Sequence, residues 1–206
     1  DSAVHSRDEQ QINNYLKASI AIYEKDYRNV LKFLDAAPDT AGRPGHQTMM
    51  FEALLAAQDI GRLPGCVNDL LRVVPRNSIH GYIESRLYPL LTELLQERRF
   101  TEADKVAAVL LPATAPEYFS VAAPSVNMLL LSAMDRRAYG LIIDYAAFLL
   151  KKDPQNVMAN LATGEALLAM GRPQDALTWL AKIPESLPVF YDQSRAWLML
   201  KEDGKA

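Results

Sequence analysis

The residues of this 206-residue chain that could do chemistry are few and isolated. A cysteine thiolate can act as a nucleophile or metal ligand, and a histidine as an acid, a base or a ligand. The chain has one cysteine, Cys66, and three histidines, His5, His46 and His80. A single cysteine excludes an internal disulfide and any zinc site built on several thiolates. Single histidines carry little weight as catalytic candidates, so we expect local or surface roles for His46 and His80.

Catalytic and nucleotide-binding motifs are also missing from the sequence. It has no Gly-rich phosphate loop, no Gly-x-Ser-x-Gly elbow and no His-Glu-x-x-His helix. We therefore predict that the chain is not an enzyme and has no catalytic residue, no metal site and no cofactor. Cys66 is expected to pack in the core, because a free cysteine behaves as a small hydrophobic residue.

The composition is that of an ordinary globular protein, with 50% hydrophobic and 23% charged residues. The formal net charge is -3, which gives no reason to expect a nucleic-acid partner or an anionic membrane surface. No uninterrupted apolar run approaches 18 residues, so we expect no membrane insertion of this segment. A protein or peptide is the expected partner, and the oligomeric state is left open.

The compartment is left open between cytoplasm and periplasm. The chain begins at Asp1 without an initiator methionine, so we expect that it is a fragment of a longer or processed protein. A lone thiol suits the reducing cytosol, and it equally suits a periplasmic domain that avoids mispaired disulfides.

The chain repeats a pattern of turn, bulky residue, apolar helix and proline five times. The bulky residue of each unit, which we call its marker, is Tyr27, Leu63, Phe100, Tyr139 or Pro173. These positions are 36, 37, 39 and 34 residues apart. Three residues after each marker stands a small or apolar residue: Val30, Cys66, Ala103, Ile142 and Ala176. A period this regular indicates repeated structural units.

Each unit is predicted to be a pair of helices. Apolar residues recur at spacings of three and four, for example from Leu87 to Leu95, whereas sustained two-residue alternation is absent. A single helix pair cannot bury both of its apolar faces, but consecutive pairs that stack can. The predicted class is therefore all-α. Ala113–Pro124, which contains Pro116 and Pro124, is expected to be the longest loop.

Residues 157–177 resemble a tetratricopeptide repeat. Small residues stand where that family packs its helices closely: Gly164 in the first helix, Gly171 at the turn and Ala176 early in the second. The third unit resembles the family less closely, and the others match in period and pattern, which leaves related helical repeats open. The resemblance covers about residues 10–200. It implies a right-handed α-solenoid of about five antiparallel helix pairs plus a C-terminal capping helix.

We expect residues 1–206 to form a single helical repeat domain. Its predicted repeat units are 8–38, 41–75, 77–112, 122–154 and 155–184. A helix over 189–201 is expected to cap the array. Its apolar contacts would come from Tyr191, Ala196, Trp197, Leu198 and Leu200.

One set of equivalent positions in the first helices, which we call the column, is expected to bind the partner. These positions lie 12 and 8 residues before each marker and hold Tyr15, Ser19, Phe51, Leu55, Tyr88, Thr92, Asn127, Leu131, Leu161 and Glu165. The column continues three residues further, through Ile22, Gln58, Leu95, Met134 and Leu168. The resemblance implies that these positions face a concave groove. Tighter packing that buries them as core is the alternative.

The composition of the column points to an apolar, aromatic-lined groove. Members of the resembled family that bind chaperones hold a C-terminal carboxylate with lysine, arginine and asparagine, and the column has no basic residue. We therefore predict a non-enzymatic protein–protein interaction scaffold or adaptor that binds a peptide, helix or subunit. One alternative is an assembly or docking domain of a larger bacterial secretion, polysaccharide-export or pilus machine. A second is a helical hydrolytic domain, which would require a deep pocket holding a carboxyl group of raised pKa.

Overall fold

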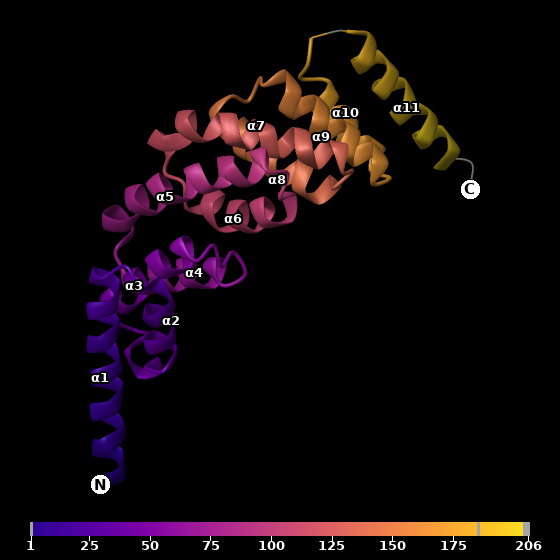
Figure 1. Ribbon diagram of the computed structural model, residues 1–206. Helices are drawn as coiled ribbons and strands as arrows, with labels where there is room; N and C mark the ends of the chain where they lie inside the picture. The colour runs from indigo at the N-terminus through magenta and orange to yellow at the C-terminus, as the bar shows by residue number, and fades with distance from the viewer. Residues whose placement is uncertain (1, 185, 204–206) are drawn as a thin grey trace. The chain divides into compact units, whose positions relative to one another are not determined.

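The computed structural model describes residues 2–184 and 186–203, and these form helices and turns without a strand (Figure 1). The α-helices are α1 (Ser2–Tyr23), α2 (Tyr27–Asp35), α3 (Pro44–Ala56), α4 (Leu63–Val73), α5 (Arg76–Gln96), α6 (Phe100–Ala113), α7 (Phe119–Asp135), α8 (Tyr139–Lys152), α9 (Val157–Ala169), α10 (Pro173–Leu180) and α11 (Leu187–Asp203). Two 3-10 helices, η1 (Pro38–Thr40) and η2 (Pro116–Tyr118), precede α3 and α7. The predicted all-α class is confirmed. Among these residues, no helix is both long enough and apolar enough to cross a membrane.

The chain divides into two compact units. Unit 1 contains residues 1–94 and 101–113, and unit 2 contains residues 95–100 and 114–206. In unit 1, α3 packs against α1, α2 and α4. In unit 2, α8 packs against α7 and α9, α10 packs against α9, and α11 lies against both α9 and α10. The prediction of one continuous domain, and the handedness of its solenoid, stay predictions.

Five turns share one backbone conformation. The second residue after α1, α3, α5, α7 and α9 is left-handed, with φ between 51° and 72°, and these residues are Lys25, Gln58, Arg98, Arg137 and Gly171. In the fifth turn the Gly171 amide donates to the Leu168 carbonyl at 3.1 Å, and the Arg172 amide donates to the Leu167 carbonyl at 2.8 Å. Equivalent pairs of bonds close the first, second and fourth turns. This is the Schellman arrangement, which ends a helix and reverses the chain.

The five markers lie at one structural position. Each is the first residue of the helix that follows the turn, namely α2, α4, α6, α8 or α10. Three residues into these helices, Val30, Cys66, Ala103, Ile142 and Ala176 are all buried. The small or apolar residue after each marker therefore contacts the core in the first turn of the second helix.

A glycine lets α9 and α10 approach closely in unit 2. A Cβ atom on Gly164 would lie 2.6 Å from Cδ2 and 2.8 Å from Cγ of Leu180. Leu180 is fully buried in a cluster with Leu167, Leu168 and Ala176, so its side chain has little freedom to move aside. The close helix packing expected at Gly164 is confirmed.

Two expectations about the ends of elements are wrong. The predicted loop Ala113–Pro124 is largely helical, because η2 and the start of α7 occupy it and Pro124 lies inside α7. Pro124 is the sixth residue of α7, where a proline removes one intrahelical hydrogen bond. In α11, Tyr191, Trp197 and Leu198 do not supply the apolar contacts expected of a capping helix, since they are 67%, 62% and 61% exposed.

The exposure of these side chains follows from helix geometry. Val189, Asp192 and Ala196 are buried and lie on one face of α11, three and four residues apart. A single helix that packs through that face must leave the opposite face uncovered. The apolar character of this opposite face is therefore not explained by the fold of the chain itself.

Replacing Gly164 with alanine should destabilise unit 2. The added Cβ would overlap Leu180, and overpacking of this kind costs about 1–3 kcal/mol. Gly140→Ala in α8 is the matched control, because a Cβ there meets nothing within 4 Å. Alanine favours helix over glycine by up to about 1 kcal/mol, so the control should be neutral or stabilising. Urea denaturation measures both, and equal midpoints for the two variants would contradict the close contact.

Candidate functional site

The unit 1 members of the column lie at different depths. Tyr15 and Ser19 on α1 are half-buried, as are Leu55 on α3 and Thr92 on α5. The hydroxyl of Ser19 donates to the Tyr15 carbonyl, and that of Thr92 donates to the Tyr88 carbonyl, both at 3.0 Å. Both hydroxyls are therefore bound within their own helix.

Phe51 and Tyr88 correct the expectation of an exposed aromatic face. Phe51 is fully buried and Tyr88 is only 7% exposed. The Phe51 ring centroid lies 5.8 Å from that of Tyr82 on α5, so the ring packs between helices of unit 1. For these two side chains the core alternative holds. Side chains enclosed in this way can contact a partner only if the unit opens.

The unit 2 members of the column are more accessible. Asn127 and Leu131 lie on α7, where Asn127 is half-buried and Leu131 is 48% exposed. On α9, Leu161 packs against the core cluster around Leu180, and Glu165 is half-buried. Glu165 lines a cavity together with Met134, which belongs to the continuation of the column. That the column binds a partner stays a prediction.

The unit-2 cavity has a volume of about 500 Å³. Its walls come from the end of α7, the turn and start of α8, the middle of α9 and the first half of α11. The residues that line it are Met134, Arg137, Tyr139, Ile142, Ala162, Glu165, Ala166, Ala169, Pro188, Tyr191, Asp192 and Arg195. This volume lies within the range of small-ligand pockets. One wall is mostly alanine, and the opposite wall carries the charged residues of α11.

Two carboxyl groups dominate the electrostatics of the unit-2 cavity. Asp192 is 4% exposed, and the nearest guanidinium nitrogen of Arg195 lies 3.6 Å from its carboxylate. Burial raises the pKa of Asp192 above its ordinary value, and Arg195 opposes that rise. Burial also raises the pKa of Glu165, the neighbouring Asp192 raises it further, and Arg195 opposes the rise. The ionised form of each carboxyl group is thus disfavoured by its surroundings.

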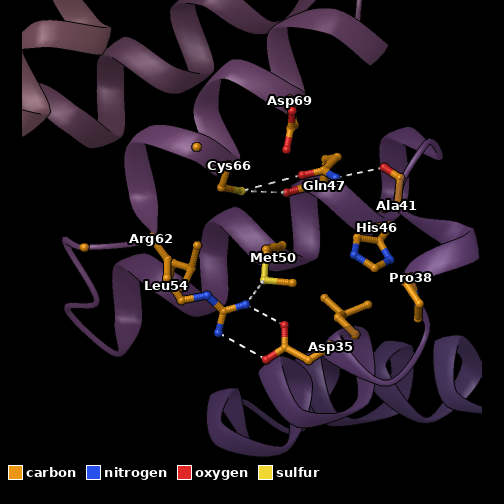
Figure 2. A pocket seen from close by; sticks show the side chains of 13 residues that line it. Asp35, Pro38, Ala41, His46, Gln47, Met50, Leu54, Arg62, Cys66 and Asp69 are labelled. Carbon is orange, nitrogen blue, oxygen red and sulfur yellow. Dashed lines mark hydrogen bonds and ion pairs between the residues drawn. The ribbon is translucent and has the colours of Figure 1, made fainter.

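A second cavity, of about 470 Å³, lies in unit 1 between α2, η1, α3 and α4 (Figure 2). Arg62 and Asp35 form an ion pair on one side of it, with one N···O distance of 3.1 Å. On the other side the Gln47 amide donates to the Ala41 carbonyl at 2.8 Å. The Cys66 thiol contacts the carbonyl of Gln47 at 3.7 Å. Each of these polar side chains therefore has a partner within unit 1.

One histidine and the single cysteine are buried in unit 1. His46 Nδ1 shares a 2.8 Å hydrogen bond with the Thr40 hydroxyl, and burial lowers the pKa of its imidazole. Burial raises the pKa of the Cys66 thiol to about 12, so it stays protonated at neutral pH and is a poor nucleophile. Cys66 is 7% exposed and packs in the core, as expected.

Sequence reasoning found one charged group of the unit-2 cavity and missed the others. Glu165 was expected from its repeat position, whereas Arg137, Asp192 and Arg195 lie outside the column. A signal for Asp192 exists in the sequence. Val189, Asp192 and Ala196 follow helical spacing, which places an aspartate on the apolar face of a predicted helix. Within the described residues, no group of three or more His, Cys, Asp or Glu is arranged to hold a metal ion.

Two substitutions in the column separate core from surface. Phe51→Ala should cost about 3–5 kcal/mol of unfolding free energy, because it empties a fully buried site. Leu131→Ala removes a side chain that is 48% exposed and should cost less than about 1 kcal/mol. Denaturant melts of both variants measure the difference. A small loss for Phe51→Ala would mean that this ring does not pack in the core.

Glu165→Gln should stabilise the protein at neutral pH. Because the pKa of Glu165 is raised in the folded chain, its ionised form opposes folding at pH 7, and protonation at lower pH removes that penalty. We expect the variant to melt about 1–3 °C above the parent at pH 7 and to differ little from it at pH 4. Glu93→Gln, at an exposed position of α5, is the control and should not shift the midpoint. A lower midpoint for Glu165→Gln at pH 7 would show that the carboxylate is stabilised where it lies.

The likeness of this chain to known proteins lies in structure rather than in sequence. No protein family matches the sequence, and no curated protein matches it. Among solved structures, the TPR domain of P58(IPK) aligns over 100% of this chain and 69% of its own, with 14% identity and a TM-score of 0.42. The architecture described above, a succession of helix pairs closed by equivalent turns, fits a tetratricopeptide-like repeat fold.

Proposed function

We propose that this chain is a non-enzymatic scaffold or adaptor that binds a peptide, helix or subunit of another protein. The observation that carries the proposal is an uncovered apolar face on α11. Its members, which we call the α11 stripe, are Phe190, Tyr191, Trp197 and Leu198, and they are 47–67% exposed. Large exposed apolar patches on a folded protein usually mark interaction sites.

The α11 stripe is one surface rather than four scattered residues. Successive helical residues are about 100° apart, so the four side chains fall within an arc of about 120°. Three of the four are aromatic, and aromatic side chains are enriched among the residues that dominate binding energy. The opposite face of α11 packs on α9 and α10, which would hold the stripe in place before a partner arrives. A preformed surface of this kind lowers the entropy cost of association.

A second apolar stripe supports the same function from unit 1. Ile12, Leu16, Ile20 and Tyr23 on α1 are 47%, 54%, 60% and 90% exposed. Their spacings of four, four and three residues place them on one helical face. End helices of repeat arrays usually present a polar outer face to water. An assembly domain of a larger machine would use the same stripes, with neighbouring subunits as partners.

Hydrolysis is a second candidate, and the unit-2 cavity is the observation that favours it. A deep pocket holding a carboxyl group of raised pKa is the feature that a hydrolytic domain requires. Paired catalytic carboxyl groups, however, normally have pKa values that their surroundings move apart, giving one acid and one base. Here burial raises the pKa of both Glu165 and Asp192. This supports binding over hydrolysis.

Removing the α11 stripe should abolish partner binding without unfolding the chain. Trp197→Ala combined with Leu198→Ala deletes two exposed side chains, so the melting midpoint should change little. Loss of hot-spot residues costs at least about 2 kcal/mol, which is roughly a 30-fold loss of affinity. Affinity capture with cross-linking mass spectrometry would identify the partner and the residues it contacts.

The matched control removes equally exposed apolar side chains elsewhere. Val121 and Met158, on α7 and α9, are 62% and 43% exposed. The double variant Val121→Ala, Met158→Ala should capture the partner as the parent does. If the α11 variant also binds normally and its stripe forms no cross-links, this surface is not the docking site.

A further inference from the structure

The unit-2 cavity holds a carboxyl group that makes no direct contact with a positive charge among the described residues, although Arg195 attracts it at longer range. Within the described residues, the Glu165 side chain makes no hydrogen bond or ion pair, although it is half-buried on α9. Asp192 lines the same cavity, and its contact to Arg195 at 3.6 Å is longer than a hydrogen bond. Two carboxyl groups therefore share a partly desolvated space with incomplete compensation. A charge in such a place is costly unless a counter-charge joins it.

The arginines that line the cavity do not fully supply this counter-charge. Arg137 is exposed, and 45% of the Arg195 side chain is accessible, so water solvates both guanidinium groups. The Asp192 side chain is only 6% accessible. The formal charges of the lining sum to zero, but its positive groups lie in solvent and its negative groups lie inside. A charged ligand that suits the interior of this cavity is consequently a cation rather than an anion.

The remaining walls suit an alkyl stem attached to that cation. Met134 and Ile142 supply apolar surface, and Ala162, Ala166 and Ala169 form a flat wall on α9. The aromatic rings of Tyr139 and Tyr191 also line the cavity, and Tyr191 is 67% exposed. Lysine and arginine side chains bury their stems along apolar surface, and their charged heads are attracted to aromatic faces.

We propose that the unit-2 cavity binds a lysine or arginine side chain of a protein partner, with its charged head between Glu165 and Asp192. This inference rests on the proposed function. Tyr191 belongs both to the lining of the cavity and to the α11 stripe. A segment lying along the stripe is therefore adjacent to the cavity and can insert one basic side chain into it.

Other occupants fit the lining less well. The described residues include no metal-ligating group of three or more side chains, so a bare divalent ion lacks ligands. An anionic ligand would be repelled by Glu165 and Asp192, and the two arginines that would attract it, Arg137 and Arg195, are both hydrated. The raised pKa of Glu165 agrees with this choice, because a cation beside it would favour the ionised form.

The test uses small probes that carry one side chain and no other charge. N-acetyl-lysine methylamide and N-acetyl-arginine methylamide are titrated into the isotopically labelled full chain, and amide shifts are followed by NMR. We expect weak, saturable binding of at least one probe, with shifts confined to residues lining the cavity on α9 and α11. N-acetyl-norleucine methylamide, which keeps the stem without the charge, should bind at least about tenfold more weakly.

Variants then identify the group that receives the cation. Glu165→Gln should weaken the binding of the basic probe at least about tenfold. Glu93→Gln, at an exposed position outside the cavity, should leave the affinity for the probe unchanged. Glu165 is only half-buried and its replacement is isosteric, so the variant is expected to fold, which its melting curve checks. Equal binding of the norleucine probe, preferential binding of N-acetyl-aspartate methylamide, or no effect of Glu165→Gln would overturn the inference.

The two proposals fail in distinguishable ways. If basic probes do not bind but removal of the α11 stripe still abolishes partner capture, the cation site is wrong and the scaffold function stands. If a basic probe binds at Glu165 but stripe and control variants capture partners equally, the cavity binds cations and the proposed docking surface is wrong.

Discussion

The left-handed turn that ends the first helix of each pair is the constraint on which the rest of the structure depends. It reverses the chain within a few residues, so the second helix must return along the first. Only the fifth turn uses glycine, and the others place Lys25, Gln58, Arg98 and Arg137 in a conformation that costs about 1 kcal/mol or more for such residues. Packing of the paired helices must outweigh this strain at each of these four turns.

That recurring turn explains why the repeat could be predicted from sequence. Residue identity at the turn varies, but the distance from the turn to the second helix is nearly constant. In four units the marker follows the left-handed residue by two positions, and in the second unit Leu63 follows Gln58 by five. The helix pairs can therefore be predicted from the period and from small residues such as Gly164 and Ala176. The geometry of the turn restricts the period, and close helix packing restricts the size of these residues.

Side-chain exposure was less predictable, because it depends on neighbours that the period does not describe. Phe51 and Leu131 occupy column positions, yet Phe51 is enclosed and Leu131 is 48% exposed. The enclosure of Phe51 involves Tyr82, a residue of the next helix pair whose position has no counterpart in the repeat pattern. The unit-2 cavity likewise takes one wall from α11, which lies beyond the last repeat, so counting repeat positions could not anticipate Asp192 and Arg195 in its lining.

Binding and folding are coupled in unit 2 through α11. This helix packs on α9 and α10 through Val189 and Ala196, and the same face brings Asp192 beside Glu165. Repulsion between the two carboxyl groups opposes the docking of α11, whereas apolar burial and the attraction of Arg195 to Glu165 favour it. A ligand that contacts both α9 and α11 binds only the docked form and so stabilises it by mass action. A cation at Glu165 would therefore hold α11 in place, and with it the apolar stripe on its outer face.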